Sequence, residues 1–321
     1  MKLNQLRYFL RIVEAGSMSK AAKLLGVAQP ALSQHIANLE HELGAKILER
    51  TSGGVHATAA GEVLSDHART IMRQVEQAYL DVSHTDRTPR GEVVVVLAEA
   101  AAGFIAPSLS IAVEGTHPEV HITAMEAMSV RASELVENGH VDLGFLPYGH
   151  LLKKVEALPV ITEHLYLIGR SDLELAGDAP IDFKDACNAP LILPSNPHFL
   201  RKKLEQTAFD HGLKMDVRAN QDSTRLLQSY IETGYAYSIL PLPSFYEGVR
   251  AGRLFARKVI NPVIPRLMTI AWSRHKPLNK ASRVVADELL RLIAKLNAEG
   301  VLPGDLVERG SEGDFMLGST G

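Results

Sequence analysis

Residues 16–44 read GSMSKAAKLLGVAQPALSQHIANLEHELG, and this stretch decides how the N-terminal part of the chain folds. Three glycines stand where an apolar helical repeat stops, as expected of residues that end helices in the left-handed conformation: Gly16, Gly26 and Gly44. Ser17 is placed to cap one short helix, and Pro30 is tolerated in the first turn of the next. The stretch therefore predicts two helices joined by a short turn.

Each helix of this region carries one apolar face. The positions are Leu3, Leu6, Phe9, Leu10 and Val13 in a preceding helix, Met18, Ala21, Ala22 and Leu25 in the second, and Leu32, Ile36, Leu39 and Leu43 in the third. The outer face of the third helix offers hydrogen-bonding groups and almost no acid: Gln29, Ser33, Gln34, Asn38 and His41. Amides can bond adenine edges in the major groove, which favours a helix-turn-helix. A three-helix bundle with a solvated polar face explains the pattern equally well.

Two short segments, residues 46–50 and 55–58, lie on either side of a turn sequence, Thr51-Ser52-Gly53-Gly54. Segments of this kind around a glycine-rich turn predict a two-stranded hairpin, which beside a helix-turn-helix would form a wing. Arg50 would then lie near the DNA backbone and contact a phosphate.

The order and spacing of these residues resemble the signature of LysR-type transcriptional regulators over about the first 65 residues. The matching segments are residues 16–25, 29–33, Leu39-Glu40, Leu43-Gly44, Glu49-Arg50 and 58–61. The resemblance implies a winged helix-turn-helix, a long dimerising linker helix and a two-subdomain α/β effector domain similar to periplasmic solute-binding proteins of type 2. It also implies a homotetramer that binds double-stranded promoter DNA and regulates transcription.

By this resemblance, ten residues are expected to contact DNA: Ser17, Ser19, Lys20, Gln29, Pro30, Ser33, Gln34, Asn38, Arg50 and Thr58. Three departures from the family pattern bear on affinity. Ala28 stands where Ser or Thr is common, Asn38 stands where Arg is frequent, and the wing at 52–56 lacks the arginines often found there. We therefore expect weak contacts from a single domain and binding that depends on a dimer.

A long helical pattern without proline follows Thr58 and extends to about residue 86. Its apolar residues recur at alternating spacings of four and three, which is typical of a coiled-coil seam: Leu64, Ala68, Ile71, Val75, Ala78 and Val82. Pairing through this seam would hold two wings about one DNA turn (~34 Å) apart. The alternative is a helix that packs only on its own domain.

Composition limits the class of protein. With 321 residues, 46% of them hydrophobic, the chain can form two or three domains with sizeable cores. It has no apolar run of about 18 residues, no secretory signal at its start and one cysteine, Cys187, so we expect a cytoplasmic protein that spans no membrane. The net charge is −3, yet residues 1–60 hold seven Lys and Arg against four Asp and Glu. The basic excess therefore lies in the helix-turn-helix.

From residue 91, short β-branched runs alternate with helical stretches, which predicts an α/β effector domain over 91–300. Two subdomains are expected, I at about 91–161 and 266–300, and II at about 162–265; the return to the first near Pro265 comes largely from the family resemblance. The glycine-rich tail, 301–321, is expected to be disordered. These domains follow a winged helix-turn-helix over 1–58 and a linker helix over 59–88.

Ligands of open α/β sheets bind at the carboxyl ends of strands, against helix N-termini. By resemblance, the loops at 98–103, 126–129, 147–148, 195–199 and 222–224 line an effector cleft for a small metabolite or carboxylate. The candidate residues are Glu99, Ala100, Ala101, Ser129, Tyr148, Ser195, His198 and Thr224. Each serine or threonine could instead cap a helix, and Arg201 could be a cationic partner or an exposed helix charge. Glu99 could repel an anion or bind an amino group.

Other functions fit the sequence less well. It contains no GxSxG, HExxH or GxxxxGK[ST] pattern and no cluster of Cys and His ligands, so we expect neither an enzyme nor a metal site or cofactor. A solute-binding protein would need an export signal and would not carry the first 60 residues. A nucleoid-organising protein would have little use for an α/β module of about 200 residues. The sequence therefore predicts a transcription regulator that responds to a small molecule.

Overall fold

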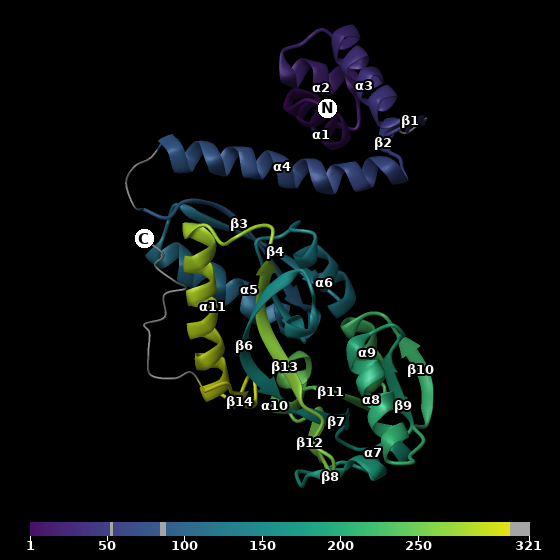
Figure 1. Ribbon diagram of the computed structural model, residues 1–321. Coiled ribbons are helices and arrows are strands. Elements are labelled where there is room, and N and C mark those ends of the chain that lie inside the picture. Colours follow the sequence, from purple (N-terminus) through teal and green to yellow (C-terminus); the bar gives the residue numbers. More distant parts are fainter. Residues whose placement is uncertain (52–53, 84–87, 309–321) are drawn as a thin grey trace. The chain divides into compact units, whose positions relative to one another are not determined.

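The computed structural model describes residues 1–51, 54–83 and 88–308. Contacts within the chain divide it into two units, Met1–Thr88 and Pro89–Gly321, and each unit is described by itself (Figure 1). None of the described helices is both long and apolar enough to cross a membrane.

The first unit is helical with a small hairpin. Its elements are α1 (Leu3–Ala15), α2 (Met18–Leu25), α3 (Gln29–Leu43), β1 (Leu48–Thr51), β2 (Gly54–Ala57) and α4 (Ala59–Ser83). Helices α1 to α3 end at Gly16, Gly26 and Gly44, which have φ angles of +60°, +67° and +66°. Leu6, Phe9, Leu32 and Leu39 form the centre of one shared core. The helix-turn-helix predicted from the glycines and the apolar spacing is therefore present, with β1 and β2 as its wing.

A buried carboxylate joins α3 to the wing. Glu40 accepts hydrogen bonds from the N–H of Ile47 (3.1 Å) and from the Lys46 ammonium (2.6 Å). Burial alone would raise the pKa of Glu40, but these bonds and one from the Leu48 N–H outweigh it, so the pKa lies below its usual range. The apolar stripe of α3 ends here, because Leu43, expected in the core, is exposed.

Only the first part of α4 packs on the helix-turn-helix. Ala68 is completely buried in that core, and Leu64 and Ile71 pack against it. Further along, Val75 is partly exposed and Val82 is 83% exposed. Within this chain Ala68 has no exposed surface left for a second helix, whereas Leu64 and Ile71 are only partly buried, so the intermolecular seam stays a prediction for the other positions.

The second unit begins with a six-stranded sheet in the order β14-β6-β13-β5-β3-β4. Its strands are β3 (Gly91–Ala98), β4 (Val120–Ala127), β5 (Leu143–Pro147), β6 (Val155–Glu163), β13 (Arg266–Ser273) and β14 (Gly304–Leu306). Helices α5 (Glu99–Thr116) and α11 (Lys280–Ala298) cover one face, where Val93, Val95 and Leu97 point. Helix α6 (Ser129–Glu137) covers the other face, where Val94 and Val96 point. Because both faces are covered, β3 is apolar at consecutive positions.

A second group of strands forms the other subdomain, with a four-stranded sheet in the order β11-β7-β12-β8 and a parallel β9–β10 pair. The strands are β7 (Leu165–Arg170), β8 (Ile181–Asp182), β9 (Leu191–Pro194), β10 (Val217–Gln221), β11 (Ser238–Pro241) and β12 (Leu254–Ile260). The helices are α7 (Phe183–Asn188), α8 (Phe199–Asp210), α9 (Thr224–Glu232) and α10 (Tyr246–Arg250), with single 3₁₀ turns at Gly149–Leu151 and Pro243–Phe245. The chain crosses between the two sheets at His164 and again at residues 261–265.

The structure corrects two expectations about irregular segments. The sequence predicts a loop at residues 98–103, but α5 already begins at Glu99. The start of the expected tail is ordered: Leu302 is completely buried, and β14 pairs with β6. The side chain of Asn297 holds this turn by donating to the carbonyls of Leu302 and Gly304 (both 3.0 Å). Residues 309–321 lie outside the described residues.

The ordered segment after α11 should contribute measurably to stability. We expect Leu302→Ala to lower the free energy of unfolding of the full chain by about 2–5 kcal/mol, because it leaves a cavity in the core between α11 and the sheet. Leu306→Ala, at a position that is 44% exposed, should change it by less than about 0.5 kcal/mol. Urea unfolding of both variants measures this, and equal losses would contradict the placement of Leu302.

Candidate functional site

The outer face of α3 carries a row of exposed amides that are held by hydrogen bonds. The Ser19 hydroxyl, on α2, donates to the Oε1 of Gln29 (2.9 Å), and the Gln34 amide donates to the Oδ1 of Asn38 (2.8 Å). Pro30 is exposed beside them, Ser33 is half-buried, and Lys20 is exposed on α2. Ser17 caps α2, since its hydroxyl accepts from the Lys20 N–H (3.4 Å). The structure therefore brings the predicted contact residues of α2 and α3 to one exposed surface.

The two predicted contact residues beside the hairpin differ in their surroundings. Arg50 is exposed on β1, opposite Val55. The hydroxyl of Thr58 is used in hydrogen bonds within the chain. It donates to the Lys46 carbonyl (2.6 Å) and accepts from the Gly61 N–H (3.1 Å) at the start of α4. The tip of the wing, residues 52–53, lies outside the described residues.

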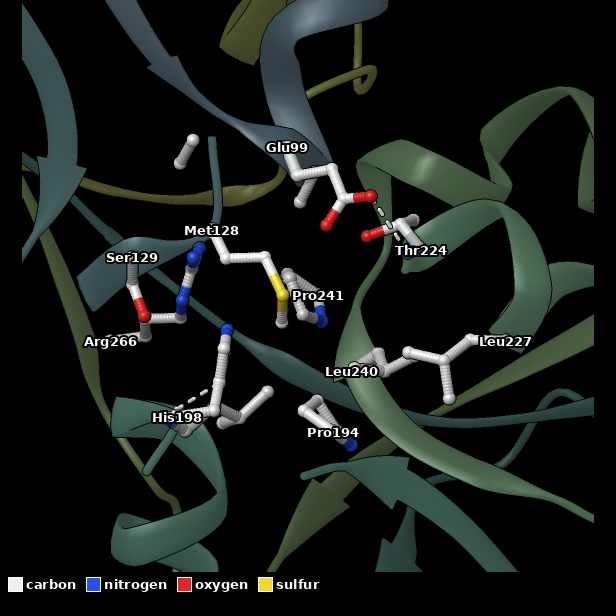
Figure 2. Close-up of a pocket in the computed structure, with 13 residues that line it drawn as sticks. Glu99, Met128, Ser129, Pro194, His198, Thr224, Leu227, Leu240, Pro241 and Arg266 are labelled. Atoms are coloured by element: carbon white, nitrogen blue, oxygen red, sulfur yellow. Dashed lines mark hydrogen bonds between the residues drawn. The ribbon is translucent and has the colours of Figure 1, made fainter. Parts of the chain in front are cut away.

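In the second unit, a pocket forms where four helices begin. Strands β3, β4, β9 and β10 lead into α5, α6, α8 and α9, and the first turns of these helices meet at the pocket. Helix N-termini carry free N–H groups and partial positive charge, so such a place suits an anion. The free space is about 430 Å³, including the mouth that opens to solvent. Its polar lining residues are Glu99, Ser129, His198, Thr224 and Arg266 (Figure 2).

One wall of the pocket has a buried cation. Arg266 is 4% exposed and forms an ion pair with Glu163, its neighbour across the β6–β13 ladder. Burial raises the pKa of Glu163, against the lowering effect of Arg266. Within the described structure, the Arg266 Nε and the hydroxyl of Ser129, which is 3% exposed, have no hydrogen-bond partner. Buried polar groups are rarely left unsatisfied, so these two donors suit a polar ligand or water.

The opposite wall carries an acid. The Oε1 of Glu99, in the first turn of α5, accepts a hydrogen bond from the N–H of Thr224 at the start of α9 (2.8 Å; Figure 2). Helix α5 packs on the six-stranded sheet and α9 on the other subdomain, so this bond spans the cleft. The Ser244 hydroxyl makes a second such bond, to the carbonyl of Ala100 (3.1 Å).

His198 is a neutral donor at this site. Burial lowers its pKa to about 4, helped by the positive charge of Arg266 and opposed by Asp222. Its Nδ1 accepts from the N–H of Leu200 (3.2 Å). The proton of the neutral ring is therefore on Nε2, which can donate to a ligand.

The structure places five of the eight predicted effector residues on the pocket: Glu99, Ala100, Ser129, His198 and Thr224. Three others lie elsewhere. Ala101 lies in the first turn of α5, which begins earlier than expected, and its side chain is buried in the core. Tyr148 donates to the carbonyl of Pro265 (3.0 Å) and packs edge-on against Phe199, and Ser195 is not among the lining residues.

Sequence reasoning missed Arg266, which lines the pocket, and did not name Met128, although Met128 lies in the loop 126–129 that was expected there. A signal for Arg266 existed, since it is the only charged residue of a strand whose other residues are apolar or neutral. The arginine considered instead, Arg201, is bound to Glu205 (2.6 Å) and Asn220 (2.9 Å).

Cys187 is a packing residue. Its side chain is buried in the core of the second subdomain, and burial raises the pKa of its thiol to about 11. A reactive cysteine needs the thiolate form and access to solvent, and Cys187 has neither.

The two units match two family models. Residues 3–62 match the bacterial regulatory helix-turn-helix of the lysR family, and residues 86–294 match the LysR substrate binding domain. The chain belongs to the LysR family. It is a LysR-type, DNA-binding transcription regulator with an effector-binding domain.

Relatives span almost the whole chain. The nitrogen assimilation regulatory protein nac of Klebsiella aerogenes is 30% identical over 300 residues, which is 93% of this chain and 97% of that protein. A full-length OxyR variant of Pseudomonas aeruginosa has the same fold, with a TM-score of 0.66 at 22% identity over 90% of this chain and 98% of that one. The LysR family regulator CbnR gives a TM-score of 0.65 at 21% identity, over 91% and 99%.

Burial of His198 predicts a pH dependence of stability. Its folded-state pKa of about 4 lies below the usual value near 6.5, so between these values the unfolded chain binds a proton that the folded chain does not. Its contribution to stability is present above about pH 6.5 and is lost as the pH falls toward 4. Wild type should therefore lose more Tm than His198→Asn between about pH 7.5 and 5. His275→Asn, at an exposed site, should behave like wild type. Equal losses in wild type and His198→Asn would contradict this.

Proposed function

We propose that α3 enters the major groove and reads the operator through its amides. The observation that carries this is the exposed row of Gln29, Gln34 and Asn38, held on a helix that Glu40 anchors to the wing. Gln34 keeps one N–H and its Oε1 free after bonding Asn38, which is the donor and acceptor pair that an adenine edge needs. Ser17, Ser19, Lys20 and Arg50 would contact the backbone. A solved CbnR structure is complexed with target DNA, which supports this use of the fold.

We infer that two copies pair through the outer part of α4. Val75, Ala78 and Val82 continue the heptad spacing beyond the part of α4 that packs on the helix-turn-helix, and all three are exposed in the monomer. Tyr79, 73% exposed, adds apolar area there. Exposed apolar residues at this spacing favour a coiled-coil partner. We propose a homotetramer built from such dimers, acting in the cytoplasm where its DNA target lies.

We infer that the pocket between the subdomains is the effector site and that a small carboxylate modulates promoter binding. Support comes from the meeting of four helix N-termini and from the two unsatisfied donors of Ser129 and Arg266. The bonds from Thr224 to Glu99 and from Ser244 to Ala100 join the subdomains at this place, so a ligand would change the contacts that hold them together. The Ser129 hydroxyl has no base hydrogen-bonded to it in the described structure, which supports a binding role over catalysis.

Two variants separate base reading from backbone contact. Gln34→Ala should change the operator sequence that is preferred, because it removes an amide that bonds a base edge. Arg50→Ala should weaken binding to all sequences alike and reduce the slope of log K against log salt by about 0.9, because one phosphate contact is lost. Gel shifts over an operator library and a salt series measure both, with Lys153→Ala, an exposed lysine of the other unit, as control. Unaltered shifts for both variants would refute these roles.

The pairing role of α4 can be tested with matched valines. Val75→Asp combined with Val82→Asp should shift the protein toward smaller species in sedimentation at about micromolar concentration, because charges would enter an apolar seam. Operator affinity should fall with it. Val63→Asp, at an exposed valine of the same helix outside the seam, should leave the assembly intact. A wild-type monomer, or loss of assembly in the control alone, would refute the seam.

A further inference from the structure

We propose that the pocket selects an amphoteric effector, a small amino-carboxylic acid whose ammonium group faces Glu99 and whose carboxylate faces Ser129 and Arg266. This rests on the proposed effector role of the pocket and names the class of ligand it takes. Figure 2 shows the two polar walls on opposite sides, with the side chain of Met128 between them.

The wall formed by Ser129 and Arg266 supplies donors for a carboxylate. The guanidinium is already paired with Glu163, so it brings little net charge. What it offers is an Nε–H without a hydrogen-bond partner in the described structure, on the same pocket as the unpartnered hydroxyl of Ser129, the first residue of α6. The Nε2–H of neutral His198 is a third donor on the pocket. Two or three donors at a helix N-terminus match the oxygens of a carboxylate.

The wall formed by Glu99 supplies a negative charge that is not paired with a cation in the described part of the chain. Glu99 follows β3 directly, and Glu126 lies on β4 opposite Leu97, so the sheet register brings the two acids close together. The pKa of Glu126 is raised by burial and by the negative charge of Glu99. Among the described residues, no Lys, Arg or His forms an ion pair with either carboxylate.

This charge arrangement discriminates between ligands. A second carboxylate on the ligand would meet Glu99 and be repelled, whereas a protonated amine would be attracted to it. Glu99 uses Oε1 to bind the Thr224 N–H, which leaves Oε2 for the amine. An amine bound there would contact the group that ties the two subdomains together.

The other lining residues restrict the chemistry of the ligand atoms that lie between its two charged groups. Met128, Pro194, Leu227, Leu240 and Pro241 are apolar, so the atoms between the two charged groups should be aliphatic. The free space of about 430 Å³ includes the open mouth, so the room enclosed by the lining residues is smaller than this figure and suits a compact molecule.

Four compounds of similar length test the proposal on the full-length protein: L-norvaline, 5-aminopentanoate, pentanoate and pentylamine. Titration calorimetry and thermal shift should show binding of at least one amino-carboxylate, with pentanoate and pentylamine each about tenfold weaker or more, because each lacks one charge-assisted contact. Pentanoate binding as tightly as the better amino-carboxylate, or no binding by either amino-carboxylate, would overturn the proposal. In the former case the proposed effector site would stand.

A variant pair assigns the ammonium contact. Glu99→Gln keeps an oxygen for the Thr224 N–H but removes the charge, so it should weaken the amino-carboxylate about tenfold and bring pentanoate to equal affinity. Glu114→Gln, on an exposed position of the same helix, should bind all four compounds as wild type does. Retained discrimination in Glu99→Gln would overturn the assignment. Should this variant fail to fold, the comparison of the four compounds on wild type still decides the ligand class.

Discussion

The arrangement of the effector domain depends on the buried ion pair between Glu163 and Arg266. Glu163 is the last residue of β6 and Arg266 the first of β13, and the chain leaves or re-enters the six-stranded sheet directly beyond them. Desolvating two charges is costly, and removing one partner would leave the other unpaired, at a cost of about 3–5 kcal/mol. The pair therefore joins the end of β6 to the start of β13, where the two residues face each other in the strand register. It also places the Arg266 guanidinium on the wall of the pocket.

The pocket is built from two subdomains, and the chain crosses between them at His164 and at residues 261–265, next to this ion pair. Its first-turn residues come from α5 and α6 on one side and from α8 and α9 on the other. The contacts between Glu99 and Thr224 and between Ser244 and Ala100 join the sides without a ligand. A ligand that exchanges with these contacts changes the relative stability of subdomain arrangements, which is the physical requirement for an effector to act at a distance.

In the first unit, one buried carboxylate has a comparable role. Glu40 binds the backbone at the start of β1, so the wing and α3 keep a fixed relation and the amides of α3 lie on an exposed face. The apolar residues of helix α4 fall into two parts: Ala68 is buried in this core, whereas Val82 is exposed. Spacing alone could not separate the two parts, because a heptad and a helix packed on its own domain place apolar residues at nearly the same intervals.

The sequence by itself determined the short helices, the hairpin and the α/β alternation, because glycine stops, apolar periods and strand runs are local signals. Its resemblance to the family then favoured a helix-turn-helix over a plain three-helix bundle. Its resemblance to the family, together with the place of these residues at helix starts after strands, also named five residues that line the pocket: Glu99, Ala100, Ser129, His198 and Thr224. Only the tertiary structure decided that Arg266 belongs to the pocket, that Tyr148 and Ala101 do not, and that residues 301–308 are ordered. Those outcomes depend on pairings between segments about 100 or more residues apart, such as β6 with β13 and β14, which no local pattern encodes.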